Sequence, residues 1–126
     1  MAYNVKSYTD VEQAIHENIW WWGKSYDIIL GGGVAIVELQ MEDESPLNAY
    51  VKGLSVVNEE RRKGWAKKLL TTCEDIARLN KKSYLYLCVD KGNIWLTEFY
   101  KNQGFEVTHV DEHEYQMTKY LSPKTI

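Results

Sequence analysis

The sequence is poor in proline, cysteine and histidine, and each shortage argues against a class of protein. Only two prolines occur among 126 residues, and no low-complexity tract or internal repeat is visible, so no interdomain linker is expected. The two cysteines, Cys73 and Cys88, each lie in an apolar segment, which favours buried reduced thiols over a disulfide. His109 and His113 are four residues apart across a strand end and a turn, with no third ligand apparent, so no metal site is predicted.

Long hydrophobic runs and a strong positive charge are also missing. No stretch approaches membrane-spanning length and no secretory signal pattern is seen, so we expect no membrane partner and a cytoplasmic location. The formal net charge is −3, whereas general nucleic-acid binders are usually basic. The basic run at residues 61–63 is diluted by Glu59 and Glu60, and no groove-reading helix pattern accompanies it, so no nucleic-acid partner is predicted.

The length and the apolar content are sufficient for one hydrophobic core. A chain of 126 residues fits one domain, residues 1–126, and leaves little room for a second. At this size a compact fold buries roughly two thirds of the surface of the unfolded chain. The sequence leaves a homodimer open.

Hydrophobic periodicity predicts that strands alternate with helices along the chain. We expect strands at residues 2–7, 26–30, 34–41, 49–57, 84–89, 105–110 and 114–121. We expect helices at residues 11–22, 64–79 and 93–102. Strand–helix–strand units favour parallel pairing in the middle of a sheet, and hairpins favour antiparallel pairing outside it. The predicted fold class is α/β (α+β): a mixed, centrally parallel sheet of about six to seven strands with helices on both faces.

The stretch VVNEERRKGWAKKLL, residues 56–70, passes from the end of a predicted strand into the first turns of a predicted helix. A helix start carries backbone N–H groups without intrahelical partners and the positive end of the helix dipole. Gly64 allows an anion to approach the backbone, and Arg61, Arg62 and Lys63 add positive charge. The loop is therefore suited to a phosphate or pyrophosphate.

Other glycine-rich and nucleotide-binding patterns do not explain this chain. Neither GxxxxGK[ST] nor GxGxxG is present. The three glycines at residues 31–33 are followed by a strand pattern and not by a helix, so a flexible hairpin turn is favoured there.

Two motifs resemble the signatures of the GNAT superfamily, the acyl-CoA-dependent N-acyltransferases. Arg61-x-x-Gly64-x-Ala66 is similar to the family pattern Q/R-x-x-G-x-G/A, between a strand and an amphipathic helix. NIWLTEFYKNQGFEV, residues 93–107, resembles the second signature through an Asn that opens a helix, a Tyr seven residues later and a Gly-Phe pair. The resemblance implies transfer of an acetyl or acyl group from acetyl-CoA to a primary amine by direct attack in a ternary complex.

The resemblance also implies how the coenzyme is held, without a metal ion. The pyrophosphate would contact backbone amides of residues 61–67, and the pantetheine arm would pair with residues 54–56 like an added strand. The N–H of Leu54 would hold the thioester carbonyl and its oxyanion. The implied coenzyme-binding residues are Leu54, Ser55, Val56, Arg61, Arg62, Lys63, Gly64, Trp65, Ala66, Lys67 and Asn93.

By the same resemblance Tyr100 is the general acid that protonates the departing thiolate, with a core aromatic as the alternative. Some family members carry a glutamate base four residues before the position of Leu54. Tyr50 stands there in this chain, and Glu38 is a candidate substitute. Cys88 could act as a nucleophile, but core packing is favoured.

The acceptor site is predicted from the stretch IWWWG, residues 19–23. Three consecutive tryptophans cannot all face one side of a helix, so some of them must be exposed or line a cleft. The resemblance implies that this N-terminal region forms a wall of the acceptor pocket, with Trp21 and Trp22 in it. Core packing by one or two of the tryptophans is the alternative. The acceptor itself is open, and small-molecule and protein amines both fit. The alternative function is a non-catalytic GNAT-like module that binds acyl-CoA as a sensor or interaction domain.

Overall fold

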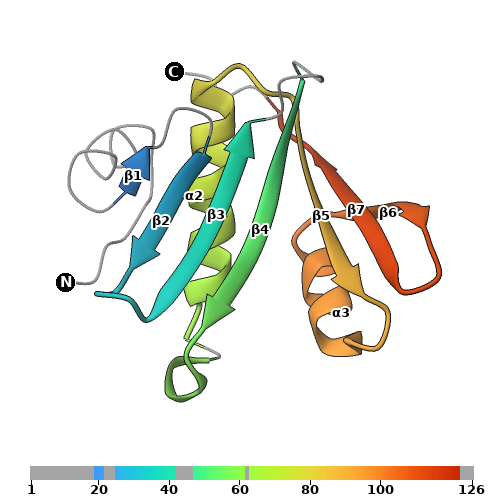
Figure 1. Cartoon of the computed structure of the whole chain (residues 1–126), viewed down its shortest axis with the longest axis horizontal. Helices are drawn as coiled ribbons and strands as arrows, with labels where there is room; N and C mark the ends of the chain where they lie inside the picture. Colours follow the sequence, from blue (N-terminus) through green and yellow to red (C-terminus); the bar gives the residue numbers. More distant parts are fainter. Residues whose placement is uncertain (1–18, 22–24, 42–46, 62, 123–126) are drawn as a thin grey trace.

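The computed structural model describes residues 19–21, 25–41, 47–61 and 63–122, which form one seven-stranded mixed sheet and its helices (Figure 1). The strands lie in the order β1-β2-β3-β4-β5-β7-β6. They are β1 (Ile19–Trp21), β2 (Ser25–Leu30), β3 (Ala35–Met41), β4 (Asn48–Val56), β5 (Tyr84–Asp90), β6 (Glu106–Val110) and β7 (Glu114–Tyr120). The helices are the short 3-10 helix η1 (Asn58–Glu60), α2 (Trp65–Leu79) and α3 (Ile94–Asn102).

The pairing pattern confirms the predicted mixed sheet with a parallel centre. Strands β1 to β4 form an antiparallel meander, and β5, β7 and β6 form a second antiparallel group. The two groups meet where β4 runs parallel to β5. Among the described residues this pairing joins only Asn48–Tyr50 to Tyr84–Tyr86, after which the two strands diverge (Figure 1).

A bulge bends β4 in the part that has left β5. Glu38 of β3 faces Lys52, whereas Ile36 faces Ser55, so β4 contains one residue more than β3 in this interval. Gly53 lies inside the bulge with a φ of 68°, a left-handed conformation that glycine adopts easily.

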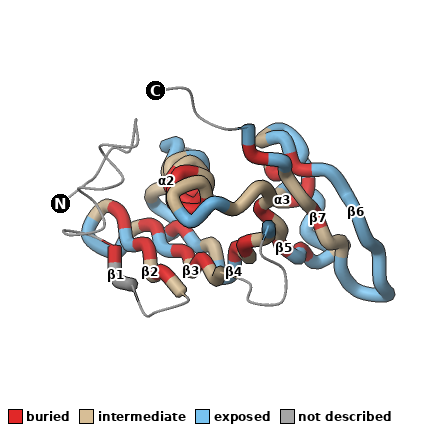
Figure 2. The backbone as a smooth tube through the Cα atoms, turned by 90° about the horizontal axis from the view of Figure 1, so that it is seen from above, coloured by how far each residue is buried: buried red, intermediate tan, exposed pale blue. Residues whose placement is uncertain are grey.

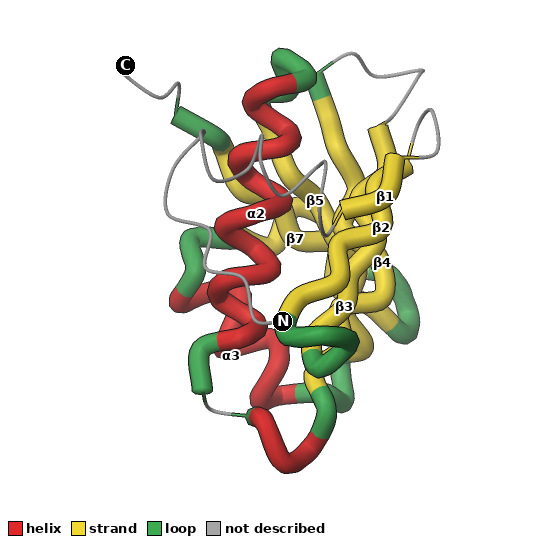
Figure 3. Tube along the Cα trace, turned by 90° about the vertical axis from the view of Figure 1, so that its left-hand side faces the viewer, coloured by secondary structure: helices red, strands yellow, loops and turns green. Residues whose placement is uncertain are grey.

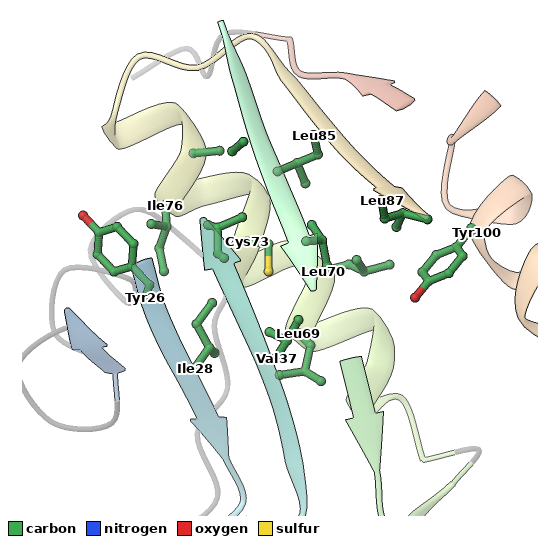
Figure 4. Packing of buried hydrophobic residues seen from close by; sticks show 14 of the residues in the cluster. Tyr26, Ile28, Val37, Leu69, Leu70, Cys73, Ile76, Leu85, Leu87 and Tyr100 are labelled. Carbon is green, nitrogen blue, oxygen red and sulfur yellow. The ribbon is translucent and has the colours of Figure 1, made fainter. Parts of the chain in front are cut away.

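The core lies between the sheet and α2. Leu69, Cys73 and Ile76 of α2 are fully buried, as the helical stripe predicted, and Trp65 is half-buried. They pack against Ile28 and other inward side chains of the strands (Figure 4). Burial alternates along β2 and β3, as expected for strands with one face on the core (Figure 2).

Helices α2 and α3 lie on the same side of the sheet (Figure 3), so the described residues show helices on one of the two faces that were predicted to carry them. Tyr100 of α3 and Cys73 of α2 belong to one hydrophobic cluster. The strand expected at residues 2–7 and most of the helix expected at residues 11–22 lie outside the described residues.

Two expectations from the sequence are wrong. The helix expected at residues 11–22 is wrong for residues 19–21, because Ile19–Trp21 forms strand β1, with Trp21 opposite Tyr26 of β2. Tryptophan and isoleucine fit a pleated surface well, so the sheet edge competes with the helix here. Cys88 is exposed and not buried, because β5 alternates and only Leu85, Leu87 and Val89 face the core.

Candidate functional site

A groove of about 670 Å³ lies between the end of β4, the start of α2 and one side of α3. Both helices begin just after the carboxyl ends of the two parallel strands, so both helix starts face the same edge of the sheet. The groove is lined by Leu54, Ser55, Val56, Glu60, Arg61, Gly64, Trp65, Ala66, Lys67, Asn93, Trp95, Leu96, Phe99 and Gln103.

The strand wall of the groove is the free part of β4. The described pairing of β4 with β5 stops at Tyr50, so the backbone of residues 54–56 turns one edge toward the groove. On the other edge β3 still holds β4, with Ala35 opposite Val56. An extended ligand with amide groups can pair with such an open strand edge.

The start of α2 forms the middle of the groove. Its first helical hydrogen bond runs from the N–H of Lys68 to the carbonyl of Gly64 at 3.1 Å, so the preceding N–H groups have no acceptor within the helix. Gly64 has a φ of 86°, and a Cβ built there meets no atom within 4 Å. The first turn of α2 contains no acidic residue. A phosphate group can therefore reach these amides without a steric obstacle at Gly64 and without an acidic side chain in the first turn of α2.

Four basic residues were expected to bind the coenzyme, and the structure describes three of them in different positions. Arg61 lines the groove, and its Nε donates to the carbonyl of Val56 at 3.3 Å. Lys67 also lines the groove. Lys63 is not among the groove-lining residues, and its Nζ lies 2.8 Å from Oε2 of Glu60. Arg62 lies outside the described residues.

Glu60 is an acid in the lining of a groove suited to anions. Its hydrogen bond with Lys63 lowers the pKa of its carboxyl group, so Glu60 is ionised at neutral pH. The Lys63 ammonium group beside it offsets that charge. Sequence reasoning noticed Glu60 only as a residue that dilutes the basic run.

The third wall is a face of α3. Asn93 caps this helix, because its side-chain oxygen accepts from the N–H of Leu96 at 3.1 Å. Leu96, Phe99 and Gln103 follow Asn93 along the groove at helical spacing, and Trp95 lies beside them. The sequence analysis missed these four residues. The spacing from Asn93 is a signal that could have found three of them.

Tyr100 lies behind this face and is not among the groove-lining residues. It is only 4% exposed, and its ring meets Phe105 edge to face at 5.6 Å between ring centres. Its hydroxyl points away from α3 toward α2 and β4 (Figure 4). Burial, with a smaller effect of Cys73, raises the pKa of Tyr100 to about 12, so the phenol stays protonated at neutral pH.

Tyr50 and Tyr86 stack at 4.8 Å at the last paired rung of β4 and β5. Cys88 follows on the same face of β5, and its pKa is raised by partial burial and by the Glu114 and Asp111 carboxylates. A protonated thiol is a weak nucleophile, which argues against an acyl-enzyme on Cys88.

The other candidate residues lie farther along the sheet. Glu38 accepts a hydrogen bond from the side chain of Gln40 at 2.6 Å and faces Lys52 across β3 and β4. Trp21 belongs to β1, so β2 and β3 separate its backbone from β4, and Trp22 lies outside the described residues.

The part of the chain that the structure describes brings together no group of three His, Cys, Asp or Glu side chains able to hold a metal ion. Within that part, neither α2 nor α3 has the length and the apolar character needed to cross a membrane.

The sequence matches the Acetyltransferase (GNAT) family over residues 2–105. No curated protein matches the sequence of this chain significantly. Several solved structures have a similar fold.

Nourseothricin acetyltransferase is 17% identical, with a TM-score of 0.69 over 78% of this chain and 65% of its own. The PaiA N-acetyltransferase of Thermoplasma acidophilum, solved in complex with coenzyme A, is 21% identical, with a TM-score of 0.67 over 88% and 66%. Ard1 of Thermoplasma volcanium is 19% identical, with a TM-score of 0.66 over 90% and 77%. The chain thus spans 65% of the length of the nourseothricin enzyme.

Proposed function

This chain belongs to the GNAT acetyltransferase family, and from that premise we propose that it transfers an acetyl group from acetyl-CoA to a primary amine by direct attack in a ternary complex. The observation that carries the proposal is the single groove formed by the free edge of β4 and the starts of α2 and α3. An extended amide chain and a pyrophosphate fit these two neighbouring surfaces.

In this proposal coenzyme A lies along the groove. Its pyrophosphate binds the N–H groups at the start of α2 beside Gly64, with Arg61 and Lys67 as charged contacts. Its pantetheine arm pairs with the edge of β4 at residues 54–56, and the Asn93 amide nitrogen donates to it. Arg62 and Lys63 complete the set of coenzyme contacts proposed from the motif; Lys63 does not line the groove, and Arg62 lies outside the described residues.

The N–H of Leu54 is proposed to stabilise the oxyanion that forms on the thioester carbonyl. The acceptor amine must be neutral to attack, although a lysine-type amine is mostly protonated at pH 7. The thiolate that leaves is stabilised if it receives a proton, and Tyr100 is the proposed donor. Its raised pKa keeps the phenol protonated at neutral pH.

The proposal names candidates for the acceptor amine and for the general base without choosing among them. Small-molecule and protein amines both fit, and Trp21 and Trp22 remain candidates for the acceptor pocket. Tyr50 occupies the position where some family members have a glutamate, and Glu38 is the candidate carboxylate nearby on β3. We also propose a cytoplasmic location for this activity.

A second candidate function is an acyl-CoA-binding module without turnover. One observation favours it: the Tyr100 side chain is buried and is not among the residues that line the groove. A general acid must come within hydrogen-bond reach of the atom that it protonates.

One experiment separates the two functions. Acetyl-CoA is incubated with a panel of primary amines, and free thiol is followed over time, with the Gly64→Glu variant as the control without a coenzyme site. Thiol release that depends on an amine supports the transferase. Saturable binding of acetyl-CoA without release on any amine would favour the module.

A further inference from the structure

An exposed tryptophan lies at the rim of the groove. Trp95, in the first turn of α3, is 58% exposed although it lines the groove. Its ring is parallel to that of Phe99, with an angle of 7° between the planes and 5.8 Å between ring centres. Helical spacing places the two rings on the same side of α3.

The arrangement leaves part of the indole open to a ligand. Phe99 is half-buried and supports one side of Trp95. The high exposure of Trp95 means that the rest of the ring remains accessible. A flat aromatic group can extend this stack, because offset stacking of aromatic rings is favourable.

Trp65, the other tryptophan in the groove, is already engaged. The Nζ atom of Lys68 lies 4.7 Å from the centre of its ring. The Trp65 ring also lies against Gly31, because a Cβ built on that glycine would be 2.9 Å from Cη2 of Trp65. Trp95 is therefore the better platform for a ligand ring.

The residues at the start of α2, on the other side of the groove, favour a ligand that also carries phosphate. Arg61, Gly64 and Lys67 line the same groove as Trp95. In a nucleoside diphosphate only one ribose separates the pyrophosphate from the base. A pyrophosphate at the start of α2 therefore keeps its base within reach of the groove walls.

We propose that Trp95, supported by Phe99, stacks on the adenine ring of the coenzyme. The inference rests on the proposed function and adds a specificity: the chain recognises the nucleotide half of coenzyme A and not only its pantetheine and phosphates. An acyl group carried on phosphopantetheine without adenosine is then a poor donor.

The test compares two ligands and four forms of the protein. The dissociation constants of coenzyme A and of 4′-phosphopantetheine are measured by calorimetry for wild type, Trp95→Ala, Trp95→Phe and Ile94→Ala. Ile94 is a matched control because it is the neighbouring residue, is 72% exposed and does not line the groove. Circular dichroism verifies that each variant is folded.

We expect Trp95→Ala to raise the dissociation constant of coenzyme A about tenfold, because the stacking of a base on an aromatic side chain contributes about this much to affinity. Its affinity for 4′-phosphopantetheine should stay unchanged, Ile94→Ala should behave as wild type, and Trp95→Phe should restore most of the affinity. Equal loss for both ligands, or no loss for coenzyme A, would overturn the platform and leave the proposed function standing. A wild-type protein that binds neither ligand would overturn both.

Discussion

At the scale of single residues, Gly64 meets two requirements at one position. Its φ of 86° is a conformation that other residues adopt at a cost, and the space where a Cβ would stand is open to the groove. Gly64→Ala should lower the free energy of unfolding by about 1–2 kcal/mol through backbone strain. Gly64→Asn should lower it less, because asparagine tolerates this conformation better. Urea unfolding of the three proteins checks both values.

Gly64→Glu tests the anion site separately from the strain. Coenzyme A that binds the native state should raise the melting temperature of wild type by mass action. In Gly64→Glu the rise should vanish, because a carboxylate then occupies the place of the phosphate, whereas Gly64→Asn should retain part of it. If folded Gly64→Glu is stabilised by coenzyme A as much as wild type, the pyrophosphate does not bind here.

Tyr100 has a consequence for stability at alkaline pH. Its pKa is about 12 in the folded chain, against an ordinary value near 10, because burial disfavours the phenolate. Between about pH 10 and 12 the unfolded chain releases this proton while the folded chain retains it. The contribution of Tyr100 to the free energy of unfolding should therefore be fully present below pH 10. It should fall by about 2–3 kcal/mol as the pH rises through 12.

Tyr100→Phe removes that titration. The difference in unfolding free energy between wild type and Tyr100→Phe, measured from pH 9 to 12, should shift against wild type as the pH rises. A difference independent of pH would show that the phenol is not held neutral by burial.

In turnover assays Tyr100→Phe should lower kcat by roughly tenfold to a thousandfold with little change in coenzyme affinity, if Tyr100 is the acid.

The base is tested by the pH dependence of kcat/KM. A phenol is a poor base at neutral pH, so Tyr50→Phe should leave the rise of kcat/KM with pH in place. Glu38→Gln should also retain it if solvent takes the proton from the amine. Disappearance of the rise in Tyr50→Phe would identify the phenol as the base, and disappearance only in Glu38→Gln would identify the carboxylate.

At the scale of elements, the sequence predicted β2 to β7, α2 and α3 from hydrophobic periodicity, or for β5 from an apolar run, together with the turn and cap residues at their ends. Asn93 and Gly64 mark helix starts, and both do so in the structure. β1 was missed because the residues around Ile19 satisfy a helical spacing while the adjacent sheet edge offers backbone partners. Such long-range pairing is not visible in a local pattern.

The parts of the candidate site that carry a local sequence signal were also predictable. The motif located the loop and Asn93, since both are tied to helix starts. Phe99 lies at helical spacing from Asn93 and could have been found, whereas Trp95 lies beside that row, and its place in the groove depends on how α3 packs. Cys88 was misjudged because the apolar run of β5 conceals an alternation that only the packing reveals.

The turn between β2 and β3 is coupled to α2 through one close contact. A Cβ on Gly31 would stand 2.9 Å from Cη2 of Trp65, so Gly31→Ala should cost about 1–3 kcal/mol in overpacking beyond its backbone strain. In a Trp65→Leu background the ring is gone and that part of the cost should disappear. Urea unfolding of the four proteins measures the coupling, and equal costs in both backgrounds would exclude it.

At the scale of the whole molecule, the groove takes one wall from each half of the sheet. Residues 54–56 and the start of α2 belong to the first half, and α3 belongs to the second. Coenzyme A that binds between them should slow amide hydrogen exchange in both halves. We expect protection at residues 54–56 and 65–67 and at the first turn of α3, measured by mass spectrometry with and without ligand. Protection confined to one half would contradict the shared groove.

The short junction between β4 and β5 also bears on how this chain could be divided. A cut between Asn80 and Ser83 would give one fragment with β1 to β4 and α2, and another with β5, α3, β6 and β7. Each fragment keeps its own antiparallel strands. The strand pairing between them is three residues long, and Lys119 of β7 is also paired with Glu74 of α2. Because the coenzyme would contact both fragments, its binding would favour their association. If each fragment is fused to part of a split reporter, the reporter signal should rise with the concentration of coenzyme A.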